Sequence, residues 1–281
     1  MFPLRAGRAV ALWLLVFLPR ESRPAELRPE TERAWESYMT LTEARISREI
    51  ASGEKFLVRD FLPPDVAGRA EETLSGGDVF VHQMETRNEE DREIDIPSGM
   101  VHHWYGTVFV PGATLEDVLR WEQDYARHQD YFDEVEASRL ISREGDAFRI
   151  FLRLRRTKLI TVHYNTEHLV VYSHHGPGRA SSKSEATHIA ELEDVGTPRE
   201  REKPSDRDRG FLWRLNSYWR FKNEADGVIV ECESISLSRD IPRGVAWMVQ
   251  SFLESVPKES LENALLPIRT HLRRPAPVPG R

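Results

Sequence analysis

One apolar stripe near the C-terminal end constrains the fold more than any other feature of this sequence. From Gly244 to Leu272 the chain reads GVAWMVQSFLESVPKESLENALLPIRTHL. Apolar residues recur there at intervals of three and four, the period of a helix with one buried face. They are Val245, Val249, Phe252, Val256, Leu261, Leu265, Ile268 and Leu272. A stripe of this length needs a large apolar surface to cover it, so the rest of the chain is expected to supply one.

Two prolines interrupt this stripe. Pro257 falls where the apolar phase slips by one residue, and proline cannot complete the hydrogen bonds of a helix interior. We therefore expect one helical turn to end at Ser255 or Val256, and a helix to restart with Pro257 in its first turn. Pro267 should add a second kink.

The N-terminal end carries the pattern of a secretory signal. Arg5 and Arg8 precede an apolar run from Ala9 to Leu18, which is too short to span a bilayer comfortably. Ala25 is the best site for cleavage, although the residues before it fit the small-residue pattern poorly. The sequence predicts export with residues 1–25 removed, and an uncleaved N-terminal anchor or a misassigned start are the alternatives.

Charge and cysteine content exclude several classes of site. The 281 residues have a net charge of −7, and the first 25 carry four Arg and one Glu, so their removal leaves −10. A chain this acidic is a poor electrostatic partner for nucleic acid, and no stable membrane insertion is expected once the signal is removed. Cys232 is the only cysteine, which excludes a disulfide within the chain and a metal site built from several thiolates.

The N-terminal part of the chain is too small for a core of its own, so we expect it to pack on the rest of the protein. The expected elements are an amphipathic helix over residues 31–50, strands at 56–58 and 79–81, turns at Pro63-Pro64 and Gly76-Gly77, and an exposed loop at 88–95. The helix would bury Trp35, Tyr38 and Ile46 on one face.

From residue 99 onward the pattern is typical of an antiparallel sheet. In order, we expect a strand at Val101–Val110, a helix from Thr114 to about Arg127, a hairpin of Val135–Arg143 and Ala147–Arg155, strands at Leu159–Tyr172 and Ser182–Leu192, a polar loop at Glu193–Gly210, and a hairpin of Phe211–Lys222 and Val228–Ser238. A curved sheet wrapped around a long helix buries both apolar surfaces and often leaves a space between them. The polar loop is either a disordered crossing or a flexible lid beside that space.

The last hairpin can be aligned residue by residue if Glu224-Ala225-Asp226-Gly227 forms its loop. The resulting pairs are Phe221 with Val230, Trp219 with Cys232, Arg220 with Glu231, and Tyr218 with Glu233. The first two pairs form the face expected to contact the C-terminal helix. Two interpretations of the other face stay open: a surface cross-strand ion pair worth about 0.2–1 kcal/mol, or a polar anchor for a ligand inside the cavity. The anchor would consist of Tyr218, Arg220, Glu231 and Glu233.

The chain resembles the START-like superfamily, also called SRPBCC, and in particular a group of uncharacterised bacterial members. The segments that carry the resemblance are HHWYGTVFVPGAT at 102–114, SRLISREGDAFRIFLRLRR at 138–156, FLWRLNSYWRF at 211–221, ECESISLSRDIPRG at 231–244 and SVPKESLEN at 255–263. The resemblance implies an α+β helix-grip fold: a curved antiparallel sheet around a long C-terminal helix. It implies a START-like domain at 99–274, an N-terminal extension at 26–98 and a disordered tail at 275–281. Pro267 departs from the unbroken helix of that family.

Members of this superfamily bind lipids, sterols, polyketides or hormones between sheet and helix, and some catalyse cyclisation or hydration. The resemblance therefore implies a mainly apolar cavity, and aromatic side chains on the inward faces are its expected lining. These are Tyr164, His168, Trp213, Trp219, Phe221, Trp247 and Phe252. We expect an exported binding protein for a lipid-like or polycyclic small molecule. The alternatives are a cyclase or hydratase using the same cavity, and a filled core that acts only through its surface.

The histidine and cysteine patterns give no chemical centre. The neighbours His102-His103 and His174-His175 point to opposite faces of a strand, so neither pair can chelate a metal as a unit. The expected neighbours of Cys232 are Trp219 and aliphatic side chains, which favour an inert core thiol. We therefore assign no catalytic residue, expect no metal and no cofactor, and leave the oligomeric state open.

Overall fold

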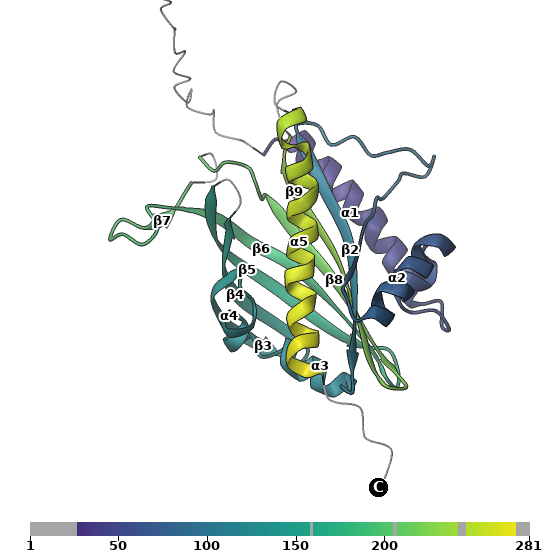
Figure 1. The fold of residues 1–281 in the computed structure, drawn as a ribbon. Coiled ribbons are helices and arrows are strands. Elements are labelled where there is room, and N and C mark those ends of the chain that lie inside the picture. The colour runs from purple at the N-terminus through teal and green to yellow at the C-terminus, as the bar shows by residue number, and fades with distance from the viewer. Residues whose placement is uncertain (1–26, 158–159, 205–206, 241–245, 274–281) are drawn as a thin grey trace, which may run out of the picture.

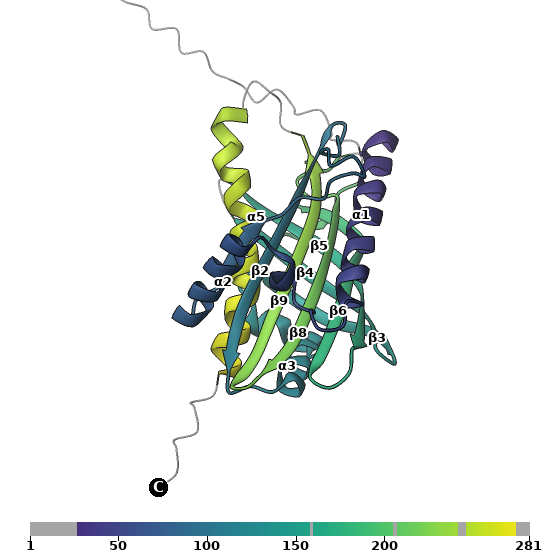
Figure 2. The same ribbon diagram turned by 90° about the vertical axis from the view of Figure 1, so that its right-hand side faces the viewer.

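A single antiparallel sheet forms the body of the protein, with helices on both of its faces (Figures 1 and 2). The computed structural model describes residues 27–157, 160–204, 207–240 and 246–273, with side chains in the last range from residue 258 onward. The described strands pair in the order β1-β2-β9-β8-β6-β5-β4-β3, and β7 adds to β6. This confirms the expected helix-grip arrangement, in which the sheet curves around the C-terminal helix α5.

Three helices, short or long, and β1 form the described part of the N-terminal extension, the remaining strands follow with short helices after β2, and α5 comes last. The helices are α1 (Pro29–Ile50), η1 (Val58–Phe61), α2 (Pro64–Gly76), α3 (Leu115–Glu122), η2 (Tyr125–Arg127), α4 (His128–Tyr131) and α5 (Ala246–Leu272). The strands are β1 (Phe80–Gln83), β2 (Gly99–Pro111), β3 (Val135–Glu144), β4 (Ala147–Thr157), β5 (Thr161–His174), β6 (Arg179–Glu193), β7 (Arg201–Glu202), β8 (Arg214–Glu224) and β9 (Gly227–Arg239). We call the face of the sheet toward α5 the inner face, and the face toward α1 the outer face.

Helix α5 runs unbroken along the inner face, so the expected end of a turn before Pro257 is wrong. The kink expected at Pro267 stays a prediction. A proline inside a helix costs about 3 kcal/mol, and burial of the apolar stripe offsets that cost. Leu261, Leu265 and Ile268 are 0–3% exposed, as the stripe predicted.

Gly106 lets α5 approach β2 closely. A Cβ atom at this position would lie 2.7 Å from Leu265 Cδ1 and 2.8 Å from Leu261 Cγ. A side chain on Gly106 would push the helix away from the strand, because Leu261 and Leu265 are themselves packed in the buried apolar cluster. The lack of a side chain at Gly106 therefore sets the distance between α5 and the sheet.

The outer face is covered by α1 (Figure 2). Apolar side chains of α1 pack against the ends of β8 and β9 in one cluster: Trp35, Tyr38, Met39 and Ile46 with Trp213, Tyr218, Ile235 and Leu237. The helical face expected from the sequence is thus the face that is buried. The N-terminal extension shares this core with the sheet.

Two expectations for the N-terminal extension are wrong. Residues 56 and 57 form a loop and Val58 begins η1, so the strand expected at 56–58 is absent. Helix α2 occupies the segment assigned to turns, because Pro64 stands in its first turn and Gly77 ends it at a φ of 88°. Proline at a helix start and a left-handed glycine at its end are helix signals as well as turn signals.

The last hairpin has the expected register. Phe221 pairs with Val230, Trp219 with Cys232 and Arg220 with Glu231, and Glu224 and Gly227 close the loop. The helix expected from Thr114 to Arg127 is instead divided into α3, η2 and the start of α4, and Thr114 caps α3.

The polar loop after β6 is held to the sheet along its described residues. Strand β7 pairs with the end of β6, and Arg153 Nη1 of β4 lies 2.7 Å from Glu200 Oε1. The described part of the loop is therefore an ordered crossing, and its role as a lid stays a prediction.

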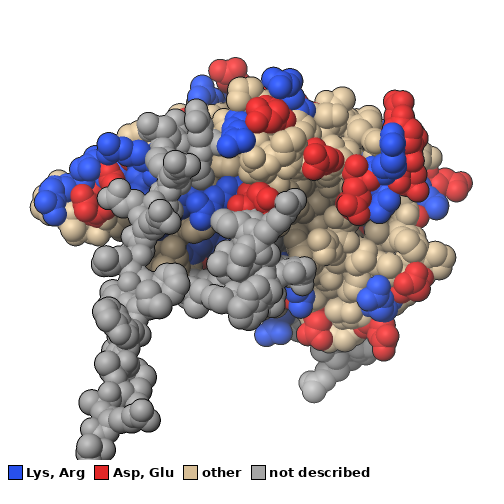
Figure 3. Space-filling view, turned by 90° about the horizontal axis from the view of Figure 1, so that it is seen from above, with Lys and Arg blue, Asp and Glu red and all other residues tan. Residues whose placement is uncertain are grey.

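On the described surface seen from above, acidic and basic side chains are interspersed (Figure 3).

Leu265→Ala is predicted to lower the unfolding free energy by about 2–5 kcal/mol, because it removes a fully buried side chain between α5 and β2. Urea denaturation measures the change. The control is Leu266→Ala on the same helix, where the side chain is 50% exposed and the expected change is within about 0.5 kcal/mol. Equal midpoints for the two variants would contradict the packing of α5 against the sheet.

Candidate functional site

Three serines lie side by side across the middle of the inner face. Ser184 of β6 pairs with Ser217 of β8, and Ser217 pairs with Ser234 of β9. Trp104 of β2 continues the row, and it faces the same side as Gly106, two residues along the strand. We call Ser184, Ser217 and Ser234 the serine row. Their short side chains extend less far toward α5 than the leucine or valine that a packed face would carry.

Exposure changes at the serine row. On the side nearer the C-terminal end of α5, Val108, Phe221 and Val230 are fully buried in one cluster with the helix. Near the row, six inner-face side chains of β2, β4, β8 and β9 are partly exposed, whereas Thr166 and His168 of β5 are buried. The six are Trp104, Leu152, Leu215, Ser217, Trp219 and Ser234. Solvent therefore reaches the inner face beside the N-terminal half of α5, whereas the other half is packed.

His168 lies on the inner face, as expected, and is buried. Its Nε2 lies 3.0 Å from Thr166 Oγ1, and its Nδ1 lies 3.4 Å from Ser184 Oγ of the serine row. Burial lowers the pKa of His168 to about 4. The imidazole is therefore neutral near pH 7 and can both donate and accept a hydrogen bond.

Trp219 and Tyr164 also face inward. The Trp219 ring stacks on Phe221 at 6.3 Å between centroids, and its Nε1 donates to Ser217 Oγ at 3.2 Å. The Tyr164 hydroxyl is buried and has no hydrogen-bond partner among the described residues, and burial raises its pKa. Phe221, at 0% exposure, fills the packed half of the inner face rather than lining an open space.

Trp213 lies on the outer face, so its expected place beside α5 is wrong. It belongs to the cluster under α1, with Trp35 and Met39. Counting in steps of two from Phe221 puts Trp213 on the inner face, but β8 begins only at Arg214, and the alternation does not extend past that residue. Trp247 and Phe252 have side chains outside the described residues, and their role as lining stays a prediction.

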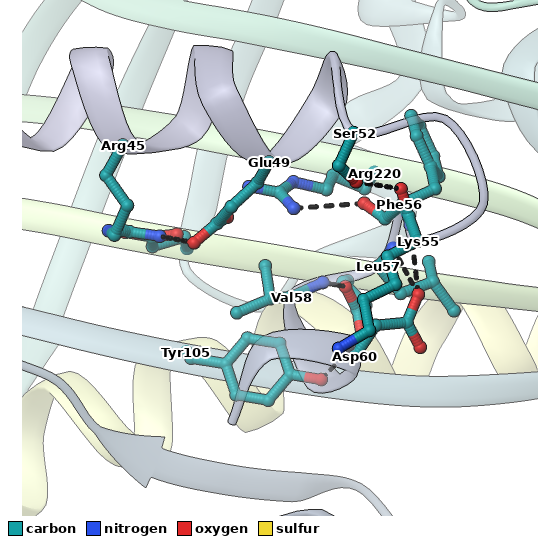
Figure 4. Close-up of polar contacts among 12 residues, drawn as sticks. Arg45, Glu49, Ser52, Lys55, Phe56, Leu57, Val58, Asp60, Tyr105 and Arg220 are labelled. Carbon is teal, nitrogen blue, oxygen red and sulfur yellow. Dashed lines mark hydrogen bonds and ion pairs between the residues drawn. The ribbon is translucent and has the colours of Figure 1, made fainter. Parts of the chain in front are cut away.

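The proposed polar anchor also lies on the outer face, buried beneath the N-terminal extension. Both interpretations of it are therefore wrong: Arg220 and Glu231 are 1% and 0% exposed, and they face away from α5. Arg220 Nη2 donates to Glu49 Oε2 at 2.5 Å, and Nη1 donates to the Phe56 carbonyl at 3.0 Å (Figure 4). Tyr218 donates to Glu43 Oε1 at 2.6 Å. Helix α1 supplies the partners that the sheet lacks.

Glu231 binds the start of η1. Its carboxyl accepts hydrogen bonds from the Tyr105 hydroxyl and the Val58 amide, both at 2.5 Å, and from the Arg59 amide at 3.3 Å. Burial raises the pKa of Glu231 to about 7, against the effect of these donors and of Arg220. The carboxyl thus fixes the loop between α1 and α2 to β9.

Glu233 is the second buried carboxyl of this network. Burial alone would raise its pKa, but the hydrogen bond from His103 at 2.7 Å and the charges of His103 and Arg45 outweigh burial and lower the pKa to about 2. His103 Nδ1 in turn lies 2.8 Å from the Tyr38 hydroxyl of α1. Since its pKa is depressed, the stability that Glu233 contributes is present above its ordinary pKa of 4.5 and is lost as the pH falls toward 2.

A groove of about 660 Å³ lies between α1 and strands β6 and β8, also on the outer side. Its wall carries four carboxylates, Glu32, Glu36, Glu43 and Glu185, together with Lys183, Arg214 and the rings of Trp35 and Trp213. Such a charged wall is a poor environment for an apolar guest. The groove is therefore a different site from the one expected beside α5.

The described residues give no metal centre. Within them, no group of three or more His, Cys, Asp or Glu side chains is placed to hold a metal ion. Cys232 is buried on the inner face, and burial raises its pKa well above the ordinary value, so the thiolate nucleophile is disfavoured. Of the helices the structure describes, none is both long enough and apolar enough to cross a bilayer.

No protein-family model matches the chain, and no curated protein matches it. It is similar to a solved STAR-related lipid transfer protein fragment from Xanthomonas axonopodis, with 18% identity, 69% of this chain and 99% of that one covered, and a TM-score of 0.45. It is also similar to a START superfamily protein from Mycobacterium smegmatis, with 9% identity, 62% of this chain and 96% of that one covered, and a TM-score of 0.42. The Zhui aromatase/cyclase from Streptomyces sp. R1128 is 11% identical, with 62% of this chain and 94% of that one covered and a TM-score of 0.44. The assignment of the helix-grip fold depends on the sheet order and on the position of α5.

Arg220→Ala is predicted to lower the unfolding free energy by about 3–5 kcal/mol, because it breaks the buried ion pair with Glu49 and leaves the Phe56 carbonyl without its donor. Arg214→Ala is the control on the same strand: its ion pair with Glu32 is partly exposed, and the expected cost is at most about 1 kcal/mol. The double variant Arg220→Met with Glu49→Leu should recover most of the loss, since both buried charges are gone. Equal costs at positions 220 and 214 would contradict a buried network.

Glu231→Gln should remove one pH dependence of stability. The folded pKa of about 7 exceeds the ordinary value of 4.5, so the folded protein keeps a proton that the unfolded chain releases. The contribution is therefore fully present below pH 4.5 and is lost as the pH rises through 7. Across this window the wild type should lose roughly 3 kcal/mol relative to Glu231→Gln.

Urea denaturation at several pH values between those limits measures the difference. The exposed Glu144→Gln provides the control, and its stability should run parallel to that of the wild type. A constant difference between wild type and Glu231→Gln would show that Glu231 does not hold a raised pKa in the folded protein.

Proposed function

We propose that the protein binds an apolar or amphipathic small molecule on the inner face, between the serine row and the N-terminal half of α5. The observation that carries this proposal is the change in exposure at the serine row. Trp219 faces inward and is partly exposed, whereas Phe221, two residues away on the same face, is 0% exposed. A large ring that faces inward and still meets solvent is typical of a binding-site wall.

The chemistry of this region suits such a guest. Trp104, Trp219 and Leu152 supply apolar surface, and the serine row with His168 supplies a few uncharged hydrogen-bonding groups. Ligand sites are commonly built from apolar walls with a small number of placed polar groups. The filled-core alternative fits the other half of the inner face, where Leu261 and Leu265 occupy the space.

We also propose that the protein is exported. Arg5, Arg8 and the apolar run from Ala9 to Leu18 support this, since they match the charged and apolar regions of a secretory signal. N-terminal sequencing of protein recovered from the exported fraction tests the proposal and should give a start near residue 26. Recovery only from the cytoplasm with Met1 intact would contradict it.

Ser217→Phe is predicted to block binding by placing a ring in the space above the serine row. The probe is diphenylhexatriene, a hydrocarbon that fluoresces when it leaves water. The wild type should enhance its fluorescence saturably, and Ser217→Phe should weaken the affinity at least about tenfold, or 1.4 kcal/mol. Ser173→Phe, an exposed position on the other face of β5, is the matched control and should bind as the wild type does.

Thermal unfolding of both variants establishes that they are folded. If the folded wild type does not bind the probe, the proposed function is wrong. If Ser217→Phe binds as tightly as Ser173→Phe, the guest does not occupy the space at the serine row.

A further inference from the structure

A carboxyl group with no hydrogen-bond partner for one of its oxygens is buried beside the inner face. Glu122 is the last residue of α3 and is 7% exposed. Its Oε1 is shielded from solvent and has no hydrogen-bond partner among the described residues. A polar atom buried without a partner is costly, and native proteins keep few of them. This atom therefore needs an explanation.

Glu122 precedes Tyr125 by three residues, and Tyr125 packs in one cluster with Tyr172 and Cys232. A charge on Glu122 would add to the larger effect of burial in raising the pKa of each of these three groups. The hydroxyls of Tyr125 and Tyr172 lie 2.8 Å apart and hydrogen bond to each other. This hydroxyl pair lies within an otherwise apolar cluster of residues.

This group lies at the border between the packed and the open half of the inner face. Tyr172 pairs with Ser182, Ser182 with Trp219, and Trp219 with Cys232, which makes one row across the sheet. The serine row is the next row on the same face, since Ser217 and Ser234 are each two residues from Trp219 and Cys232. The tyrosine pair therefore lies at the closed end of the proposed binding region, and Glu122 lies three residues from Tyr125 along the chain.

Burial also determines the form of the carboxyl. It raises the pKa of Glu122 to about 8, so the group is an uncharged acid at neutral pH. An uncharged acid donates one hydrogen bond and accepts others. No Lys or Arg forms an ion pair with Glu122 among the described residues.

We propose that Glu122 and the Tyr125–Tyr172 hydroxyl pair form the polar end of the binding region and hydrogen bond to a carbonyl or hydroxyl oxygen of an uncharged, otherwise apolar ligand. This inference depends on the proposed function. A ligand oxygen at this place supplies the partner that Glu122 Oε1 lacks. A ligand carboxylate would instead place an anion where burial disfavours the charged form.

Competition against bound diphenylhexatriene tests the proposal. Dodecanol and dodecane have the same chain, and they differ by one hydroxyl. The quantity measured is the ratio of the concentrations of alkane and alcohol that displace half of the probe, compared between variants. In Glu122→Leu, the concentration of alcohol needed, relative to that of alkane, should rise by roughly tenfold, because the site has lost its partner for the ligand hydroxyl. Glu122→Gln keeps a donor and an acceptor and should shift it by less than about threefold.

Glu144→Leu, an exposed position in the β3–β4 hairpin, is the matched control and should leave the ratio unchanged. Glu122→Leu should fold, because it replaces a carboxyl that lacks a partner with an apolar side chain in an apolar cluster. If wild type and Glu122→Leu bind the probe and give the same ratio, the inference is wrong while the proposed function stands. If the wild type does not bind the probe, both fail.

Discussion

The buried guanidinium of Arg220 is the constraint on which the outer half of the structure depends. A charge at 1% exposure needs partners of opposite charge and further hydrogen-bond acceptors, because the cost of leaving water is large. Strand β9 contributes the nearby carboxyl groups of Glu231 and Glu233. The hydrogen-bond acceptors of the guanidinium, Glu49 of α1 and the carbonyl of Phe56, come from the N-terminal extension, which folds back over β8 and β9.

The N-terminal extension covers the middle of the outer face, and the groove beside it, between α1 and strands β6 and β8, has a charged wall. With α1 and η1 fixed over Glu231 and Glu233, the middle of the outer face is filled by protein. Among the α5 side chains that the structure describes, Leu261, Leu265 and Ile268 pack on the inner face. At the serine row the side chains become short, and the residues around them meet solvent. One helix thus closes half of the inner face, and the other half is the region where we propose that the guest binds.

The sequence determined much of the fold because its signals are local and periodic. The stripe through Leu261 and Leu265 predicted the buried face of α5, and the Glu224–Gly227 loop predicted the register of the last hairpin. Helix α2 could not be separated from a pair of turns, because Pro64 and Gly77 are signals for both.

The site was less predictable because its contacts join distant parts of the chain. Glu49 and Arg220 are 171 positions apart, and no local pattern links them. Ile235 and Leu237, which share the strand face of the two glutamates, were the available sign that this face is buried. The serine row and Glu122 left no signal of their own, since short polar residues on strands and a glutamate on a short helix usually face solvent.

Native mass spectrometry of the purified protein, before and after organic extraction, tests most directly whether the inner face holds a small molecule. The protein should carry an added mass under native conditions, acquired in the cell or from a lipid extract, and should release it as an uncharged apolar compound on denaturation. A folded protein that shows only the mass of its chain, even after exposure to excess lipid extract, would contradict the account.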